Sequence, residues 1–399
     1  MKKKRIFIAI HYLEIGGAEI SLIGLLNAID YSRYEVDLFV YSHQGELMKL
    51  IPKEVNLLPE IPKYAQIEQP MTSVLKRGYV DVVLARLWAR FKYHQYIRKY
   101  KPQHSIAAFQ YIFDAVTPLL PSINKQVCYD LAISFLIPHN IVLEKVRAKK
   151  KVAWIHTDYS WVSVHAELEL PIWNRYDYIA SISEDVTKSF LKTFPSLKDK
   201  IVLIENILSK DLVFSRAKEE SISFPKEEGR INLLSIGRFS TPKNFDNVPD
   251  ICRWVRELGR NIYWYIIGYG GDEALIRQRI EEAGMQDYVI LLGKKENPYP
   301  YIVACDLYVQ PSRYEGKAVT VREAQMLGKP VVITDFPTAS SQLKNGVDGL
   351  IVPLENKACA EAISDFILNR KLQDRFIQFL KKHDYGNEKE VEKIYQLIS

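Results

Sequence analysis

The chain has 399 residues, of which 47% are hydrophobic and 26% are charged, and its formal net charge is +6. This length suits two domains, and the composition excludes a disordered chain, a collagen and a disulfide scaffold. Apolar runs fall short of the ~20 residues that a membrane-spanning helix needs, and the start, MKKKRIFIAI, is too short for a signal peptide. The cysteines form no C-x-x-C pair, which predicts a reducing, cytoplasmic location without structural zinc. They are Cys128, Cys252, Cys305 and Cys359.

The first half of the sequence predicts short apolar strands alternating with polar or helical segments. We expect strands at residues 5–10, 36–41, 152–155, 178–181 and 201–204, and a helix at 18–29 after the glycine pair Gly16-Gly17. The pattern restarts after a charged, weakly patterned stretch at 209–230, which we interpret as a linker.

The second half predicts a regular alternation of strands and helices. Strands are expected at 231–236, 262–267, 288–291, 306–310, 330–334 and 350–352, and helices at 245–258, 272–283 and 316–327. Such alternation indicates parallel sheets with right-handed crossovers. The expected architecture is two doubly wound Rossmann-like α/β domains facing a central cleft, at residues 1–208 and 231–383. Two helices within 372–398 break near 384–387, and a C-terminal helix in 384–399 is free to pack back on the first domain.

Two cations follow the first strand of the second half, in the loop GRFSTPKNF at 237–245. Arg238 and Lys243 lie at the carboxyl end of that strand, which is where open α/β sheets bind ligands. Arginine can grip a diphosphate with its fork of donors, and lysine can add a point charge. Position alone equally allows two solvated surface cations.

Two acids, Glu315 and Glu323, are eight residues apart around the start of the expected helix at 316–327. The first amides of that helix favour a phosphate, because they carry the positive end of the helix dipole. Glu315 could accept hydrogen bonds from sugar hydroxyls, and Glu323 could accept them from a ribose. The alternative is that both acids only complement the helix dipole.

Two further segments are weaker candidates. Gly16 and Gly17, in HYLEIGGAE, would let the backbone approach a phosphate or sugar closely, although a plain tight turn is the commoner interpretation. His156, in WIHTD, ends a strand at the cleft edge, although a lone histidine is more often structural. The sequence contains no P-loop, H-E-x-x-H or G-x-S-x-G motif, and no D-x-D clamp for Mg²⁺ or Mn²⁺.

Taken together, these motifs resemble glycosyltransferase family 4, the retaining sugar-nucleotide transferases with the GT-B fold that act in bacterial surface polysaccharide biosynthesis. The resemblance spans nearly the whole chain in order, from GGAE and WIHTD through GRFSTPKNF and LLGKKENPYPYIVACDLYVQPSRYEG to LGKPVVITD. Its specific part is the acidic pair Glu315 and Glu323 after a G-R-x-x-x-x-K loop. One departure is Ser341, with Gln342 beside it, where aligning on Gly346 would place a glutamate in many members of the family.

The resemblance implies a role for each matching residue. Arg238 and Lys243 would bind the donor diphosphate, Glu315 the hydroxyls of the donor sugar and Glu323 the ribose. His156 would reach the donor sugar and the acceptor region. The other donor-binding residues would be Gly16 and Gly17 over the phosphates, Gly293, Lys294 and Lys295 near the base, and Lys317, Ala318, Val319 and Thr320 at the phosphate and sugar.

The implied reaction transfers a hexosyl-type sugar from a nucleotide donor, UDP rather than GDP, to a hydroxyl of a glycan or lipid-linked acceptor. The setting would be capsule, exopolysaccharide or lipopolysaccharide assembly. We expect retention through front-side attack, with no metal and no cofactor, since the nucleotide-sugar is a co-substrate. Three alternatives stay open: a GT-B-fold sugar-nucleotide epimerase, an NAD-dependent oxidoreductase despite the missing G-x-G-x-x-G, and a non-catalytic sugar- or membrane-binding scaffold.

The segment 76–101 is strongly basic. Eight of its residues are Lys or Arg and Asp81 is its only acid, so its net charge of +7 exceeds the +6 of the whole chain. An apolar stripe recurs at helical spacing; it consists of Val80, Val83, Leu84, Leu87, Trp88 and Phe91. Either this stripe faces the core, or the helix lies on anionic lipid at the inner face of the plasma membrane. No nucleic acid partner is expected.

Overall fold

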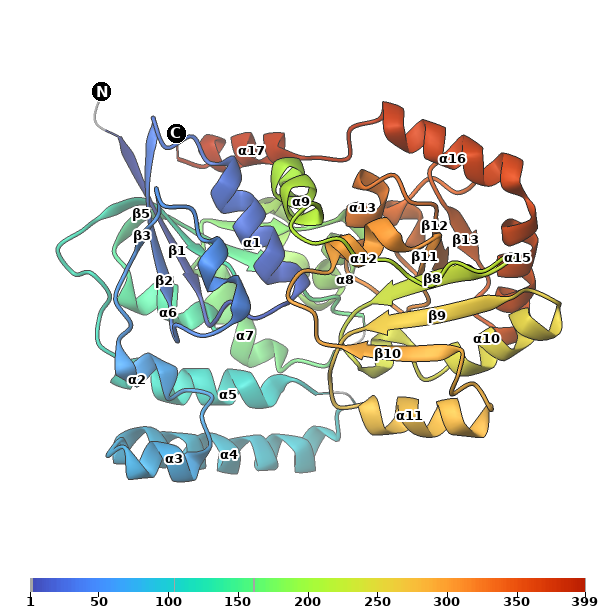
Figure 1. Ribbon diagram of the computed structural model, residues 1–399. Coiled ribbons are helices and arrows are strands. Elements are labelled where there is room, and N and C mark those ends of the chain that lie inside the picture. Colours follow the sequence, from blue (N-terminus) through green and yellow to red (C-terminus); the bar gives the residue numbers. More distant parts are fainter. Residues whose placement is uncertain (1–2, 104, 161, 399) are drawn as a thin grey trace. The chain divides into compact units, whose positions relative to one another are not determined.

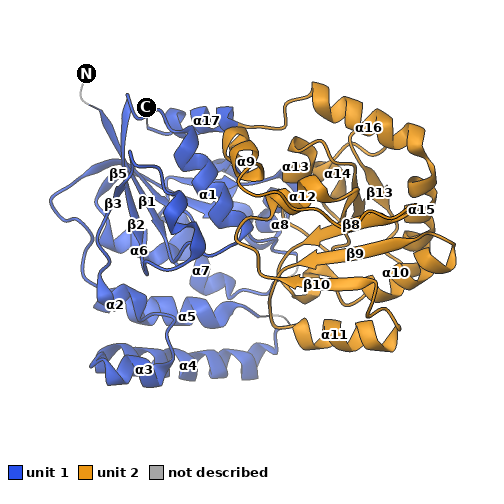
Figure 2. Ribbon diagram, in the orientation of Figure 1, with its two compact units in different colours: residues 1–207, 388–399 blue, residues 208–387 orange. Residues whose placement is uncertain are grey.

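The computed structural model describes residues 3–103, 105–160 and 162–398 (Figure 1). The chain forms two compact units, one of residues 1–207 with 388–399 and one of residues 208–387 (Figure 2). Each unit is built on one parallel β-sheet with helices packed against it. The expected fold class, two Rossmann-like α/β domains, is therefore confirmed.

The sheet of the first unit has the strand order β3-β2-β1-β4-β5-β6-β7, and all its neighbouring pairs are parallel. Strand order reverses between β1 and β4, which makes the carboxyl ends of these two strands a topological switch point. Residues 6–10 of β1 are fully buried, as a continuous apolar run in a central parallel strand predicts. The strands are β1 (Lys4–Ile10), β2 (Tyr34–Val40), β3 (Asn56–Leu57), β4 (Tyr129–Ser134), β5 (Ala148–Ile155), β6 (Tyr178–Ser181) and β7 (Ile201–Leu203).

The helices of the first unit include one long helix, α4, and several short ones. Figure 1 shows α5 between α4 and the sheet, so α4 forms an outer layer of this unit. The α-helices are α1 (Gly17–Ala28), α2 (Pro62–Ala65), α3 (Met71–Lys76), α4 (Val80–Tyr100), α5 (Ala107–Val116), α6 (His139–Lys145), α7 (Ala166–Asn174), α8 (Glu184–Thr193) and α17 (Val391–Gln396). None of the helices in the described part of the chain is long and apolar enough to cross a membrane.

The sheet of the second unit has the order β10-β9-β8-β11-β12-β13, again entirely parallel, with its switch point between β8 and β11. Every strand expected in this half is present within two residues of its expected bounds. The strands are β8 (Ile231–Ile236), β9 (Ile262–Ile267), β10 (Val289–Gly293), β11 (Leu307–Gln310), β12 (Val331–Thr334) and β13 (Leu350–Val352).

The helices of the second unit pack on that sheet and begin inside the expected linker. Residues 210–217 form helix α9, whose first turn is capped because Ser209 Oγ accepts a hydrogen bond from the amide of Leu212. The expected linker at 209–230 is thus helical over its first third. The α-helices are α9 (Lys210–Ala217), α10 (Val248–Glu257), α11 (Glu273–Glu282), α12 (Tyr299–Ala304), α13 (Val319–Met326), α14 (Ala339–Gln342), α15 (Asn356–Leu368) and α16 (Arg370–Lys382).

The last helix, α17, belongs to the first unit rather than to the second. Its Tyr395 ring stacks on Tyr34 of β2 with ring centroids 4.1 Å apart, and the Tyr395 hydroxyl accepts a hydrogen bond from the amide of Asp30 at 2.8 Å. Lys393 donates to the Leu203 carbonyl of β7 at 3.0 Å. The end of the chain therefore completes the packing of the first sheet.

We expect Tyr395→Ala to destabilise the first unit selectively, by about 3 kcal/mol, because it removes a buried ring from this packing. Hydrogen exchange measures the effect, with the slowest amides of the second unit as the internal reference. Tyr395→Phe is the matched control and should cost only about 1 kcal/mol, the loss of one hydrogen bond. Equal protection in the alanine variant and the unchanged chain would contradict this role for α17.

Candidate functional site

The candidate site of the second unit is built around the buried end of β11. Gln310, its last residue, is fully buried, and its Oε1 accepts hydrogen bonds from the Tyr308 hydroxyl at 2.7 Å and from Thr320 Oγ1 at 3.3 Å. Its Nε2 donates to Ser312 Oγ at 2.9 Å. These bonds hold the loop after β11 and the start of α13 in one arrangement, because Ser312 lies in that loop and Thr320 in the first turn of α13.

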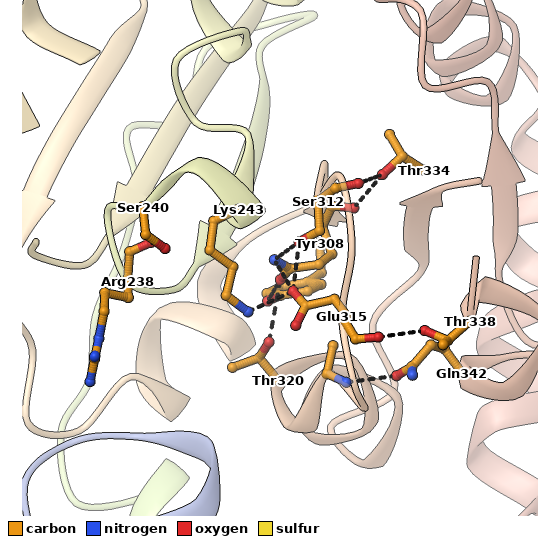
Figure 3. A network of polar contacts seen from close by, with 12 residues as sticks. Arg238, Ser240, Lys243, Tyr308, Ser312, Glu315, Thr320, Thr334, Thr338 and Gln342 are labelled. Atoms are coloured by element: carbon orange, nitrogen blue, oxygen red, sulfur yellow. Dashed lines mark hydrogen bonds and ion pairs between the residues drawn. The ribbon is translucent and has the colours of Figure 1, made fainter. Parts of the chain in front are cut away.

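Glu315 and Lys243 form an ion pair in this loop (Figure 3). Lys243 Nζ lies 2.5 Å from Glu315 Oε1, and the same oxygen accepts hydrogen bonds from Ser312 Oγ at 2.6 Å and Gln310 Nε2 at 3.4 Å. The side chains of Lys243 and Glu315 are 21% and 10% exposed. Within the described part of the chain, no hydrogen bond reaches the second oxygen, Oε2.

Arg238 lies on the same loop as Lys243 but is exposed. In Figure 3 its side chain extends from this loop without a contact to the other residues drawn. Gly237, just before it, allows Lys243 to lie against the loop, because a Cβ there would come within 3.2 Å of the lysine Cδ and Cε. The structure therefore brings Lys243 and Glu315 into contact, whereas Arg238 lies exposed on the same loop as Lys243.

A second ion pair joins the two loops of the site. Arg313 binds the Asp246 carboxylate through both terminal nitrogens, at 2.8 and 2.7 Å, and donates to the Thr241 carbonyl at 2.6 Å. A bidentate pair of this kind fixes geometry as well as adding energy. The sequence analysis missed it, since 67 residues separate the partners, although Arg313 lies in the motif that ends QPSRYEG.

Helix α13 begins after the loop, with Ala318 as its N-cap residue. The amide of Ala318 donates to Gln342 Oε1 at 2.8 Å, and Thr338 Oγ1 donates to the Glu315 carbonyl at 2.7 Å. Gln342 is thus the residue that holds the start of α13, a role the sequence did not reveal. The next amides, of Val319 and Thr320, belong to the first turn, whose N–H groups have no partner within the helix. Lys317 is half-buried just before this turn.

Glu323 lies in the interior of α13 and is almost completely buried. The Tyr299 hydroxyl donates to its Oε1 at 2.9 Å. Burial raises the pKa of Glu323 from 4.5 to about 7, and the hydrogen bond from Tyr299 and the charge of Arg216 on α9 oppose that rise. Glu323 therefore lies about one turn inside α13, four residues after the helix begins, with its side chain buried.

The end of β10 and the loop after it carry three of the expected donor-binding residues. Gly293 ends β10 with a φ of 69°, a left-handed conformation that favours glycine, and its carbonyl accepts a hydrogen bond from the amide of Gly268. The ammonium of Lys294 lies 4.5 Å from the centre of the Tyr269 ring, and that of Lys295 lies 5.6 Å from that of Tyr301. They therefore lie at the carboxyl edge shared with β8 and β11.

In the first unit, Gly16 and Gly17 form the entry to α1. Gly16 is its N-cap residue in an extended conformation, and Gly17 is its first residue. A Cβ on Gly16 would lie 2.2 Å from an oxygen of the Glu19 carboxylate. The Glu19 side chain thus folds back over the turn, and a larger residue at position 16 would displace the end of that side chain.

His156 directly follows β5, where its ring packs against Phe135 and Trp154 with centroids 4.7 and 6.0 Å away. Burial lowers the pKa of His156 to about 3, so the imidazole is neutral at physiological pH. His11, after β1, and His139, at the start of α6, are also neutral, because burial lowers their pKa values to about 4 and about 3. The sequence analysis had not singled out these two histidines.

No group of three or more His, Cys, Asp or Glu side chains is placed to hold a metal ion in residues 3–103, 105–160 and 162–398.

Comparisons with known proteins agree with this description. Residues 217–383, which lie in the second unit, match the model of the family described as glycosyl transferases group 1. The amylovoran biosynthesis glycosyltransferase AmsK of Erwinia amylovora is 27% identical over 146 residues, which are 35% of this chain and 35% of AmsK. The chain thus spans about a third of the length of this curated relative.

Solved structures resemble the chain over nearly its full length. TarM of S. aureus, solved with fondaparinux, alpha-GlcNAc-glycerol and UDP, has a TM-score of 0.70 at 14% identity and covers 99% of this chain and 100% of its own. HepE of Anabaena, solved with UDP-glucose, has a TM-score of 0.66 at 16% identity and covers 99% of this chain and 98% of its own. The expected GT-B fold is confirmed by these likenesses.

The raised pKa of Glu323 makes the stability of the fold depend on pH. Between pH 4.5 and about 7 the folded chain keeps a proton that the unfolded chain has released, so the free energy of unfolding falls as pH rises. We expect this fall to be about 3 kcal/mol larger in the unchanged chain than in Glu323→Gln, which mimics the protonated acid at every pH. Urea unfolding of both proteins between pH 4.5 and about 7 measures this difference. If the free energy of unfolding changed equally with pH in both proteins, the pKa of Glu323 would not be raised.

Proposed function

We propose that the chain is a retaining glycosyltransferase that moves a sugar from a nucleotide-sugar, with UDP favoured, to a hydroxyl of a glycan or lipid-linked acceptor. The observation that carries the proposal is the pairing of Lys243 with Glu315 at the carboxyl end of a parallel sheet, within a segment that matches glycosyl transferases group 1. The structural neighbours TarM and HepE, solved with UDP and with UDP-glucose, support this choice of donor. The name of AmsK, which refers to amylovoran biosynthesis, supports the choice of setting.

The ion pair suggests how a donor would bind. Without a donor, Glu315 neutralises Lys243 and holds its ammonium in place. A diphosphate brings negative charge to Lys243 and to the exposed Arg238, which frees Glu315 Oε1 and Oε2 to accept hydrogen bonds from hydroxyls of the donor sugar. The start of α13 adds the positive end of a helix dipole: Val319 and Thr320 lie in its first turn, Lys317 precedes it, and Ala318, whose amide donates to Gln342, is its N-cap residue.

Catalysis would then act on the leaving group. Charge develops on the diphosphate as the glycosidic bond breaks, and preorganised cations and amides stabilise that charge without having to reorganise. Neutral His156 would serve as a hydrogen-bonding group for the donor sugar or acceptor rather than as a cation. Front-side attack by the acceptor hydroxyl on the face from which the diphosphate leaves would retain the anomeric configuration.

Glu323 would bind the ribose from below the first turn of α13. With a pKa of about 7, its carboxyl group is poised between its neutral and ionised forms at physiological pH. Ionisation on donor binding would let it accept hydrogen bonds from both ribose hydroxyls. Gly293, Lys294 and Lys295 would lie near the base, and Gly16 and Gly17 would come from the first unit to the phosphates.

The test of this function is a screen of UDP- and GDP-sugars for release of the nucleoside diphosphate, followed by substitution of the two cations. Arg238→Ala and Lys243→Ala should each lower turnover by about 10²- to 10³-fold, which is the loss expected when one donor to a developing anion is removed. Arg370→Ala and Lys371→Ala on α16 are matched controls that remove equal charge elsewhere in the same unit.

If both site variants turned over at the rate of the unchanged chain, Arg238 and Lys243 would not be the residues that bind the donor diphosphate. Conversion of a donor into its epimer without any acceptor would instead identify a sugar-nucleotide epimerase. Lys243→Gln keeps much of the lysine volume, so comparing the melting temperatures of the two Lys243 variants separates loss of activity from loss of folding.

We also expect activity to survive EDTA, because the sequence holds no D-x-D clamp and the proposed mechanism assigns neutralisation of the diphosphate to Arg238, Lys243 and α13. Turnover is measured with and without the chelator on protein freed of metal by dialysis. Complete loss of turnover that Mg²⁺ restores would show that a metal performs this neutralisation instead.

A further inference from the structure

One face of α4 attaches this helix to the rest of the first unit. Val82, Ala89 and Tyr96 are buried at intervals of seven residues. Arg86 lies on the same side and donates to the carbonyls of Gln69 and Gln66, at 2.5 and 3.4 Å. Arg86 is therefore a structural residue of this attachment and not a solvated cation.

The opposite face of α4 is apolar and faces solvent. Its large side chains are between 47% and 61% exposed; they are Val80, Leu84, Leu87, Trp88 and Phe91. At 100° per residue these positions cluster on one side, about half a turn away from the buried set. The interpretation of the apolar stripe as a core-facing surface is therefore wrong: only Val83 among its six members is partly covered.

Cations border this apolar stripe along both of its edges. Helical spacing places Lys92 and Lys99 on one edge and Arg90 and Lys101 on the other, with Arg98 in line with the stripe near the end of α4. All five side chains are exposed. The Lys92 ammonium lies 5.2 Å from the centre of the Trp88 ring, which itself stacks on Phe91. Such long cationic side chains can reach a polar layer while their stems and the rings between them stay in an apolar one.

Negative charge is nearly absent from this helix. Asp81 is the only acid in residues 76–101, and it lies 2.5 Å from Lys63, which neutralises it. A second copy of the chain would bring the same cations against these and is disfavoured by repulsion. An anionic phospholipid surface complements both parts of the face, since it offers negative headgroups at the edges and acyl chains beneath the stripe.

We propose that this surface, which we call the α4 face and define by Leu84, Leu87, Trp88, Phe91, Arg90, Lys92, Arg98 and Lys99, binds anionic phospholipid bilayers with α4 lying in the plane of the interface. Each cation near such a surface contributes about 1 kcal/mol, so several together suffice for peripheral binding. The proposal goes beyond the glycosyltransferase function and does not require it, because vesicle binding is measured without donor or acceptor.

Vesicle sedimentation tests the proposal, with vesicles of phosphatidylcholine alone and of an equal mixture with phosphatidylglycerol. The unchanged chain should pellet with the mixed vesicles only, and less so at about 1 M salt, where the Debye length falls to about 3 Å. Two variants address the two parts of the face: Leu84, Leu87, Trp88 and Phe91 to Ser, and Arg90, Lys92, Arg98 and Lys99 to Gln. Each should lower the fraction bound at least about tenfold.

The matched control replaces Arg370, Lys371, Lys381 and Lys382 of α16 by Gln, which removes the same charge from exposed positions of the second unit. It should bind vesicles like the unchanged chain. All substituted side chains of the α4 face are exposed, so circular dichroism melting curves should stay within a few degrees of the unchanged protein.

Three outcomes would overturn the proposal. The first is that the unchanged chain does not sediment with the mixed vesicles. The second is that both α4 variants sediment with them to the same extent as the unchanged chain. The third is a chain that binds no vesicles but self-associates in analytical ultracentrifugation until the apolar residues are replaced, which would make the α4 face a contact between copies.

Discussion

The buried amide of Gln310 is the constraint on which the second unit's site depends. A buried polar side chain must find partners for its donors and acceptors, and Gln310 finds them in Tyr308, Ser312 and Thr320. These partners lie before, within and after the loop that follows β11. The hydrogen bonds of this one side-chain amide therefore fix the loop, and the fixed loop places Glu315 in contact with Lys243. The Arg313–Asp246 pair then locks the neighbouring loop against it.

Two carboxylates of the same segment end up in different electrostatic environments. Glu315 lies in the loop before α13, where its Oε1 pairs with Lys243 and accepts a hydrogen bond from the hydroxyl of Ser312. Glu323 is a buried residue of α13, and desolvation raises its pKa to about 7. The hydrogen bond from Tyr299 and the charge of Arg216 lower the pKa by less than burial raises it. A single helical connection thus supplies one acid that is held by a cation and one that can change its charge near neutral pH. The first unit adds histidines that burial keeps neutral.

The sequence predicts this fold well where local patterns decide it. Central parallel strands are buried on both faces and read as unbroken apolar runs, so β1, β8 and β9 could be predicted from their residues. Strand β4 could not, because Asp130 interrupts its apolar pattern; the structure accommodates that acid through the Arg5 amide and Lys149. Gln342 and the Arg313–Asp246 pair also escaped prediction, since their partners are 24 and 67 residues away. Whether the apolar stripe of α4 faces the core or the solvent could not be predicted for another reason. Periodicity reveals that a stripe exists but not what it faces.

The distribution of charge gives the outward direction of α4 a further consequence. The segment around this helix carries a net charge of +7, while the whole chain carries +6, so the other residues together are close to neutral. Taken together, the residues outside this segment would therefore add almost no net attraction to an anionic surface. Attraction at a single helix orients the first unit as well as holding it, because the apolar stripe can be buried only when α4 lies flat. For an enzyme whose acceptor is carried by a lipid, such a fixed orientation would present the same edge of the first sheet to the membrane in every encounter.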